Sequence, residues 1–78
     1  MKDLRGHNLS GTHMSRADLH GAHMQGCKLY ANLSGAHLQG AHLQGADLRG
    51  VDLRSSCLID ADLIGARIDG VDMTGASQ

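Results

Sequence analysis

The sequence repeats itself every five residues, and this period constrains the fold more than any other feature. Residues 36–50 read AHLQGAHLQGADLRG, which is three copies of Ala-His/Asp-Leu-Gln/Arg-Gly. A period of five fits neither the about 3.6 residues of an amphipathic helix nor the about 2 of a strand. A glycine in every unit would also cost a helix roughly 1 kcal/mol each time. The period therefore predicts a repeat protein whose chain turns once per unit.

A large apolar residue, called the anchor below, occupies the same place in every unit. The anchors are Leu4, Leu9, Met14, Leu19, Met24, Leu29, Leu33, Leu38, Leu43, Leu48, Leu53, Leu58, Leu63, Ile68 and Met73. Every glycine lies two positions after an anchor, and the residue two positions before the anchor is small from Ala17 onward. Strand alternation predicts that the anchor and this small residue face inward together, while the glycines turn the corners.

Several units resemble the A-(D/N)-L-x-x motif of pentapeptide repeat proteins: Ala17-Asp18-Leu19, Ala31-Asn32-Leu33, Ala46-Asp47-Leu48 and Ala61-Asp62-Leu63. The resemblance covers essentially the whole chain. It implies an all-β fold, a right-handed quadrilateral β-helix (β-solenoid) in which four units complete one coil. We then expect a single domain over residues 1–78 with just under four coils, a one-residue deletion in the repeat after Tyr30, and no evident terminal cap.

Stacking units four apart gives inward columns of anchors that contain no charged residue. We expect the core to include Leu4, Leu9, Leu19, Leu29, Leu33, Leu38, Leu43, Leu48, Leu53, Leu58, Leu63 and Ile68. Only Lys2 and His7 place a large polar residue in the columns of small residues, and both belong to the first coil. Tyr30, beside the deletion, either fills the gap in that corner or marks a contact on the outer face.

The composition limits which partners and which cellular location we expect. The 78 residues carry a net charge of -1 and include one Tyr, no Phe, no Trp and no Pro. The balanced charge predicts no direct nucleic-acid binding, and no apolar run is long enough for a membrane span. The two cysteines, Cys27 and Cys57, have neither disulfide-framework nor metal-ligand spacing, which favours a cytoplasmic protein without a cofactor.

One outward column could hold a metal ion. In the four-sided arrangement, Asp3, His23, His42 and Asp62 stack on successive coils, and two imidazoles with flanking carboxylates suit Zn²⁺ or Ni²⁺. The alternative is a solvated ladder of side chains. His37 stacks near Asp18 and Cys57 on another side without forming a nucleophile, a base and an orienting group in a pocket, so we predict that the protein is not an enzyme.

The two ends of the predicted helix differ. Residues 1–46 contain four basic residues and two aspartates, a net charge of +2, whereas residues 47–78 contain three arginines and six aspartates, a net charge of -3. The apolar last coil, with Val71, Met73 and Ala76, is a candidate docking end, and the outward Ile59 and Ile64 suggest a lateral patch. We expect a homo-oligomer, either a dimer through the C-terminal coil or a head-to-tail stack.

These features favour a non-enzymatic structural or interaction module that self-associates through its coil ends and presents ladder-like faces to an unidentified protein partner. The family resemblance implies an alternative, because some pentapeptide repeat proteins mimic DNA and bind type II topoisomerases such as DNA gyrase through a long acidic rod. This chain is short and nearly neutral, and basic residues alternate with its aspartates.

Overall fold

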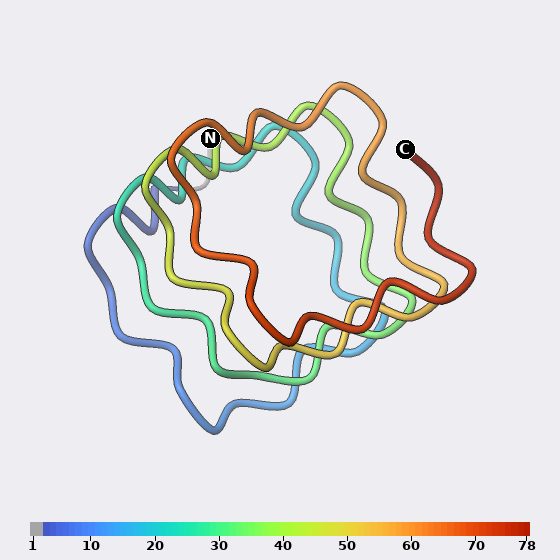
Figure 1. The fold of residues 1–78 in the computed structure, drawn as a ribbon. Helices are drawn as coiled ribbons and strands as arrows, with labels where there is room; N and C mark the ends of the chain where they lie inside the picture. The colour runs from blue at the N-terminus through green and yellow to red at the C-terminus, as the bar shows by residue number, and fades with distance from the viewer. Residues whose placement is uncertain (1–2) are drawn as a thin grey trace.

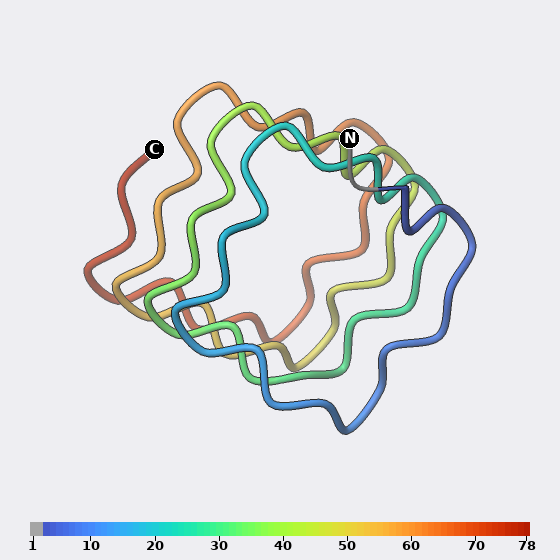
Figure 2. The ribbon, with the colours of Figure 1, turned by 180° about the vertical axis from the view of Figure 1, so that it is seen from behind.

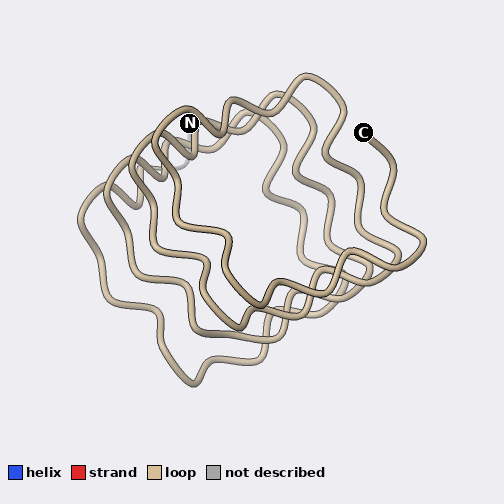
Figure 3. Cartoon of the chain, viewed as in Figure 1, coloured by secondary structure: helices blue, strands red, loops and turns tan. Residues whose placement is uncertain are grey.

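The computed structural model describes residues 3–78, which wind into a stack of similar coils lying side by side (Figures 1 and 2). Its extents are 27 × 22 × 21 Å. These residues contain no helix and no continuous strand (Figure 3), and so no helix able to cross a membrane. Each side of a coil makes isolated parallel β-bridges instead. A turn in every five-residue unit leaves too few extended residues for a longer strand.

The bridges place units four apart directly on one another. They join residues 20 positions apart, or 19 where the pair spans the deletion after Tyr30. The bridging residues, which immediately precede the anchors, form four columns: Asp3–His23–His42–Asp62, Asn8–Lys28–Asp47–Arg67, His13–Asn32–Asp52–Asp72 and Asp18–His37–Cys57–Ser77. The predicted four-unit register, with one residue missing after Tyr30, is therefore the register of the structure.

Each regular corner is a tight turn closed by one backbone hydrogen bond. The carbonyl of an anchor accepts the N–H of the residue three positions later, as Leu38 does from Ala41 at 3.0 Å. The residue between them at Gly40 has a φ of 66°, and a positive φ at only the third residue is the pattern of a type II turn, which favours glycine. Three corners without glycine adopt the same conformation: Arg16 (φ 62°), Ser55 (φ 60°) and Asp60 (φ 61°).

Backbone hydrogen bonds between coils hold the stack together, with three bonds per unit in the middle of the chain. The N–H of Leu38 donates to the carbonyl of Cys57 in the next coil at 2.8 Å, and the N–H of Gly40 donates to the carbonyl of Ile59 at 2.9 Å. In the opposite direction, the N–H of Cys57 donates to the carbonyl of Ala36 at 2.9 Å. The anchor and the corner therefore donate forward, whereas the bridging residue donates backward.

Anchors and the small residues before them form one continuous core. Its buried members are Leu19, Ala22, Met24, Cys27, Leu29, Leu33, Ala36, Leu38, Ala41, Leu43, Ala46, Leu48, Val51, Leu53 and Leu58. Partly buried residues pack against them at the ends of the stack: Leu4, Leu9, Met14, Ala17, Ala61, Leu63, Ala66, Val71, Met73 and Ala76. Burial thus follows the position of a residue along the stack.

Ile68 departs from the expectation that it would be a buried core residue. Its side chain is 50% exposed, although Leu48, in the preceding coil of the same column, is only 1% exposed. No coil of residues 3–78 covers Ile68 from above, because the chain reaches its last described residue before the column gains another member. The anchor position therefore fixes the direction of a side chain, and the next coil determines its burial.

The corner after Leu29, where the repeat lacks a residue, is built differently. Neither of the next two residues has a positive φ, and within residues 3–78 no turn hydrogen bond to the Leu29 carbonyl is found. The two longest backbone hydrogen bonds between coils adjoin this corner, from Asn32 to the carbonyl of Thr12 at 3.3 Å and from Asp52 to the carbonyl of Ala31 at 3.4 Å. The deletion thus stretches the ladder on one side.

Insertion of one glycine between Tyr30 and Ala31 should stabilise the protein. A restored five-residue unit supplies the missing turn hydrogen bond, and one such bond contributes about 1 kcal/mol. Urea denaturation followed by circular dichroism should show a higher midpoint. As a matched control, a glycine inserted between Gly40 and Ala41 interrupts a regular corner and should lower the midpoint. A loss of stability for both insertions would contradict the interpretation of the stretched bonds.

Candidate functional site

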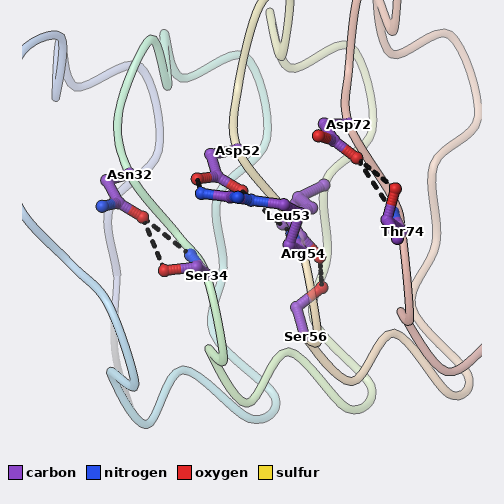
Figure 4. Close-up of polar contacts among 8 residues, drawn as sticks. All are labelled: Asn32, Ser34, Asp52, Leu53, Arg54, Ser56, Asp72 and Thr74. Carbon is purple, nitrogen blue, oxygen red and sulfur yellow. Dashed lines mark hydrogen bonds and ion pairs between the residues drawn. The ribbon is translucent and has the colours of Figure 1, made fainter.

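The aspartates and asparagines of the repeat bind the backbone of their own unit. The side-chain oxygen of the bridging residue accepts the N–H of the residue two positions later (Figure 4), as Asn32 does from Ser34 at 3.0 Å and Asp72 from Thr74 at 3.0 Å. The same bond is made by Asp3, Asn8, Asp18, Asp47, Asp52 and Asp62. The side-chain oxygen thus satisfies an outward backbone donor that faces no neighbouring coil.

Three arginines neutralise aspartates within the same unit. In each Asp-Leu-Arg unit the guanidinium makes two bonds to the carboxylate, as Arg49 does to Asp47 at 2.9 and 2.7 Å and Arg54 to Asp52 at 2.9 and 2.7 Å. Asp3 and Arg5 form the same pair. The hydrogen bonds from Arg49 lower the pKa of Asp47 to about 2, and those from Arg54 hold the pKa of Asp52 below its usual range. In these three units the outward charges therefore neutralise each other.

The stability of the fold should decline in acid, because protonation of these carboxylates removes their ion pairs with arginine. Asp47 has a lower pKa in the folded chain than in an unfolded one, so its contribution is present above about pH 4 and is lost as the pH falls toward about 2. Thermal melts should show a falling midpoint over this interval. Asp47→Asn keeps the oxygen that accepts the backbone N–H and should flatten the decline. Asp60→Asn, which removes a carboxylate without a described hydrogen bond or ion pair, should leave the slope unchanged; equal slopes in all three proteins would contradict the assignment.

The predicted histidine column is assembled by parallel bridges from Asp3 to His23, His42 and Asp62. The two imidazoles stack, with ring centroids 4.7 Å apart and planes 6° from parallel. A metal ion binds a ring nitrogen at about 2 Å and close to the ring plane, and one ion cannot lie in the planes of two parallel stacked rings. The Asp62 carboxylate accepts a bond from Gln44 at 2.9 Å, and Asp3 is paired with Arg5.

Metal binding by this column stays a prediction, and the stacked rings do not favour it. Within residues 3–78, no group of three or more His, Cys, Asp or Glu is arranged to hold a metal ion. Calorimetric titration with Zn²⁺ and Ni²⁺ should give weak binding that is equal in the wild type and in His42→Ala. Strong binding that His42→Ala abolishes would show that the rings rotate to form a site.

Tyr30 borders a shallow hollow on the outer face. The hollow, of about 650 Å³, is lined by Ser10, Lys28, Tyr30, Asp47, Arg49 and Arg67. The ring lies against the corner of the next coil, where a Cβ added to Gly50 would be 2.8 Å from Tyr30 Cε2, yet Tyr30 remains 65% exposed. Tyr30 therefore covers the Gly50 corner of the next coil, and whether it marks a contact on the outer face stays a prediction.

The two cysteines lie in different surroundings. Cys27 is fully buried in a small-residue position, where desolvation raises the pKa of its thiol to about 11. Cys57 is half-buried in the column that also holds His37, and neither cysteine forms a disulfide. Cys27 is therefore a packing residue with little thiolate at neutral pH.

The residues predicted to form interfaces are gathered toward the C-terminal end. Ile59 is 47% exposed and Ile64 is 77% exposed on the outer faces. Val71, Met73 and Ala76 are half-buried on the last coil and pack against the core. These positions agree with the predicted placement, and whether they bind a partner stays a prediction.

From the sequence we did not predict that the outward polar side chains bind the backbone and one another. There the aspartates are counted only as charges, whereas Asp47 and Asp52 accept backbone N–H groups and pair with arginines. The spacing Asp-Leu-Arg contains the signal, because two residues separated by one lie on the same face of an extended segment. Ser56 is a related case: it is buried and donates its hydroxyl to the Leu53 carbonyl at 2.7 Å (Figure 4).

Comparison with known proteins agrees with this geometry. The sequence profile described as "Pentapeptide repeats (8 copies)" matches residues 3–30 and 31–70, two segments that meet at the deletion. A comparison with curated protein sequences gave no match. The chain is similar to a solved pentapeptide repeat protein from the Arabidopsis thaliana thylakoid lumen, with a TM-score of 0.71, 28% identity, and coverage of 96% of this chain and 60% of that one.

Two further solved structures extend the comparison. QnrB1, a plasmid-mediated fluoroquinolone resistance protein, has a TM-score of 0.78 and 27% identity over 96% of this chain and 47% of that one. HetL, involved in heterocyst differentiation regulation in the cyanobacterium Nostoc sp., has a TM-score of 0.60 and 36% identity over 95% and 39%. The chain thus spans between 39% and 60% of the length of these three structures.

These neighbours imply a right-handed quadrilateral β-helix, the architecture whose four-unit register appears in the parallel bridges. The repeat profile covers most of the sequence, and the corners of the structure follow its period of five. The chain belongs to the pentapeptide repeat family.

Proposed function

We propose that this chain is a non-enzymatic structural and interaction module that self-associates through its coil ends, as a dimer or as a head-to-tail stack. The observation that carries the proposal is the uncovered last coil, where Ile68 is 50% exposed although its neighbour Leu48 in the same column is 1% exposed. Val71 and Met73 are half-buried beside it. A further coil laid on this end would remove their apolar surface from water.

The outer faces support the second part of the proposal, binding of a protein partner. They are flat ladders of side chains whose bonds lie mostly within single units, so they add little rigidity between coils. Ile59 and Ile64 are exposed apolar residues on neighbouring faces of the C-terminal half. We assign a lateral protein contact to this pair of isoleucines.

Sedimentation velocity over a concentration series tests self-association. The mass should rise above the 8.2 kDa of a single chain as the concentration increases. Ile68→Lys should reduce this rise, because it places a charge on the uncovered end, whereas Thr74→Lys, which changes an outward residue of the same coil, should not. A single species of 8.2 kDa at every concentration would refute the proposal.

A second candidate function is binding to a type II topoisomerase such as DNA gyrase as a DNA mimic. The observation in its favour is the similarity to QnrB1, a fluoroquinolone resistance protein, at a TM-score of 0.78. The paired charges oppose it, because Asp3, Asp47 and Asp52 are each neutralised by an arginine of their own unit. A gyrase supercoiling assay that shows inhibition at moderate protein excess would favour this function over the first.

Three further points belong to the proposal. They are a helix of just under four coils without a terminal cap, a cytoplasmic location, and the lack of direct nucleic-acid or membrane binding. Cysteine usage and balanced charge support the last two, although one similar protein comes from the thylakoid lumen. Fluorescence microscopy of the tagged chain tests the location directly.

A further inference from the structure

The two ends of the stack differ in their backbone hydrogen-bonding groups. In the last three complete units, residues 61–75, the N–H groups of the anchors and corners donate to no backbone carbonyl within residues 3–78; they belong to Leu63, Gly65, Ile68, Gly70, Met73 and Gly75. In the same three units, the carbonyls of the small residues before the anchors also accept no backbone bond within residues 3–78; they belong to Ala61, Ala66 and Val71. We call these nine groups the C-terminal edge, which carries twice as many donors as acceptors.

The first coil has the opposite composition. In residues 3–15, the carbonyls of the bridging residues and of the residues before the corners accept no backbone bond from the described residues; they belong to Asp3, Arg5, Asn8, Ser10, His13 and Ser15. The N–H groups of the bridging residues in the same segment, Asp3, Asn8 and His13, donate to no backbone carbonyl of the described residues. We call these nine groups the N-terminal edge. The difference follows from the ladder inside the stack, where anchors and corners donate forward and bridging residues donate backward.

From this complementarity we infer that the C-terminal edge binds the N-terminal edge of a second copy, so that the chains stack head to tail and continue the β-helix. The inference rests on the proposed self-association and selects one of its two geometries. Unlike edges can pair all nine groups in the pattern used between coils. Two C-terminal edges would bring together twelve donors and six acceptors, which leaves donors facing donors and costs desolvation without a bond.

The charges at the two ends also favour head-to-tail stacking. Residues 61–78 contain Asp62, Asp69 and Asp72 against Arg67 alone, whereas residues 3–22 balance two aspartates with two arginines and add three histidines. Two C-terminal ends therefore repel each other, and unlike ends do not. The apolar groups also match, because half-buried anchors lie at both ends, Leu9 and Met14 on the first coil and Leu63 and Met73 on the last.

Two end-blocked variants distinguish the geometries. Ile68→Lys/Met73→Lys blocks the C-terminal edge, and Leu9→Lys/Met14→Lys blocks the N-terminal edge. Head-to-tail stacking predicts that each variant alone is a monomer, and that a one-to-one mixture forms a heterodimer of twice the single-chain mass that grows no further. Sedimentation velocity and native mass spectrometry measure both results. Ser10→Lys and Thr74→Lys, on the outer faces of the same coils, should associate like the wild type.

The outcomes separate this inference from the function on which it rests. If the variant blocked at the N-terminal edge dimerises like the wild type and the mixture forms no new complex, self-association stands and head-to-tail stacking is wrong. A wild type that stays monomeric overturns both. If the lysine variants lose their cooperative melts, His13→Pro serves instead, since proline is tolerated where the N–H is unpaired. It should fold and lose association, and full association of this variant would also overturn the inference.

Discussion

Replacing Leu43 with alanine should cost about 3 to 5 kcal/mol of unfolding free energy, because it leaves a cavity in the closed middle of the stack. The Leu43 side chain is fully buried, with coils before and after it in its column. A domain of this size has a total stability of roughly 4 to 12 kcal/mol. Urea denaturation should therefore show that Leu43→Ala is close to unfolded without denaturant, and dilute samples keep the ends of the stack uncovered during the measurement.

Leu63→Ala is the matched control, because Leu63 is the anchor of the same column one coil later. Its side chain is only half-buried, so removing it opens an existing edge and should cost less than half as much. At concentrations where copies associate, the cost of Leu63→Ala should rise, since a second copy would cover this residue. Equal costs for the two variants in dilute solution would contradict the view that burial depends on position in the stack.

The register of the fold was predictable because it depends only on the number of residues in each unit and of units in each coil. With the four units per coil that the family resemblance implies, a period of five with one missing residue places Asp3, His23, His42 and Asp62 in one column, and the bridges join these residues in that order. The corners at Arg16, Ser55 and Asp60 also follow from the count, since they turn as the glycine corners do. Repetition lets many weak local preferences agree on one geometry.

The polar outer surface was less predictable, because its bonds depend on side-chain direction within a unit. Asp52 could face solvent, a neighbouring coil or its own backbone, and the period allows all three. The structure selects the last, and Arg54 then binds the same carboxylate. The stacking of His23 on His42 is a similar case, because the register brings the rings together without fixing their planes.

The exposure of Ile68 lies outside what the repeat can predict. Every inward position looks alike in the sequence, and burial requires another coil on the next level. The mismatch between a core-like residue and a 50% exposed side chain is what points to association through this end. This departure from the rule of the repeat is visible in the structure and not in the sequence.

Gly40→Val should be the most damaging substitution at an open corner, with a cost of about 2 kcal/mol or more. The φ of Gly40 is 66°, and a Cβ at this position would meet no atom within 4 Å, so the cost arises from the backbone conformation and not from a clash. Gly40→Asn should cost much less, because asparagine tolerates the left-handed region. Both variants are compared with the wild type by urea denaturation.

The reverse change one coil later completes the comparison. Asp60 occupies the same corner as Gly40 with a φ of 61°, so Asp60→Gly should relieve strain and raise stability by about 0.5 to 1 kcal/mol. The gain is smaller than the loss at Gly40 because aspartate is one of the residues that visit this conformation, whereas a β-branched valine is not. If Gly40→Val proved no worse than Gly40→Asn, positive φ could not be the reason that glycine recurs, and the five-residue turn would need another explanation.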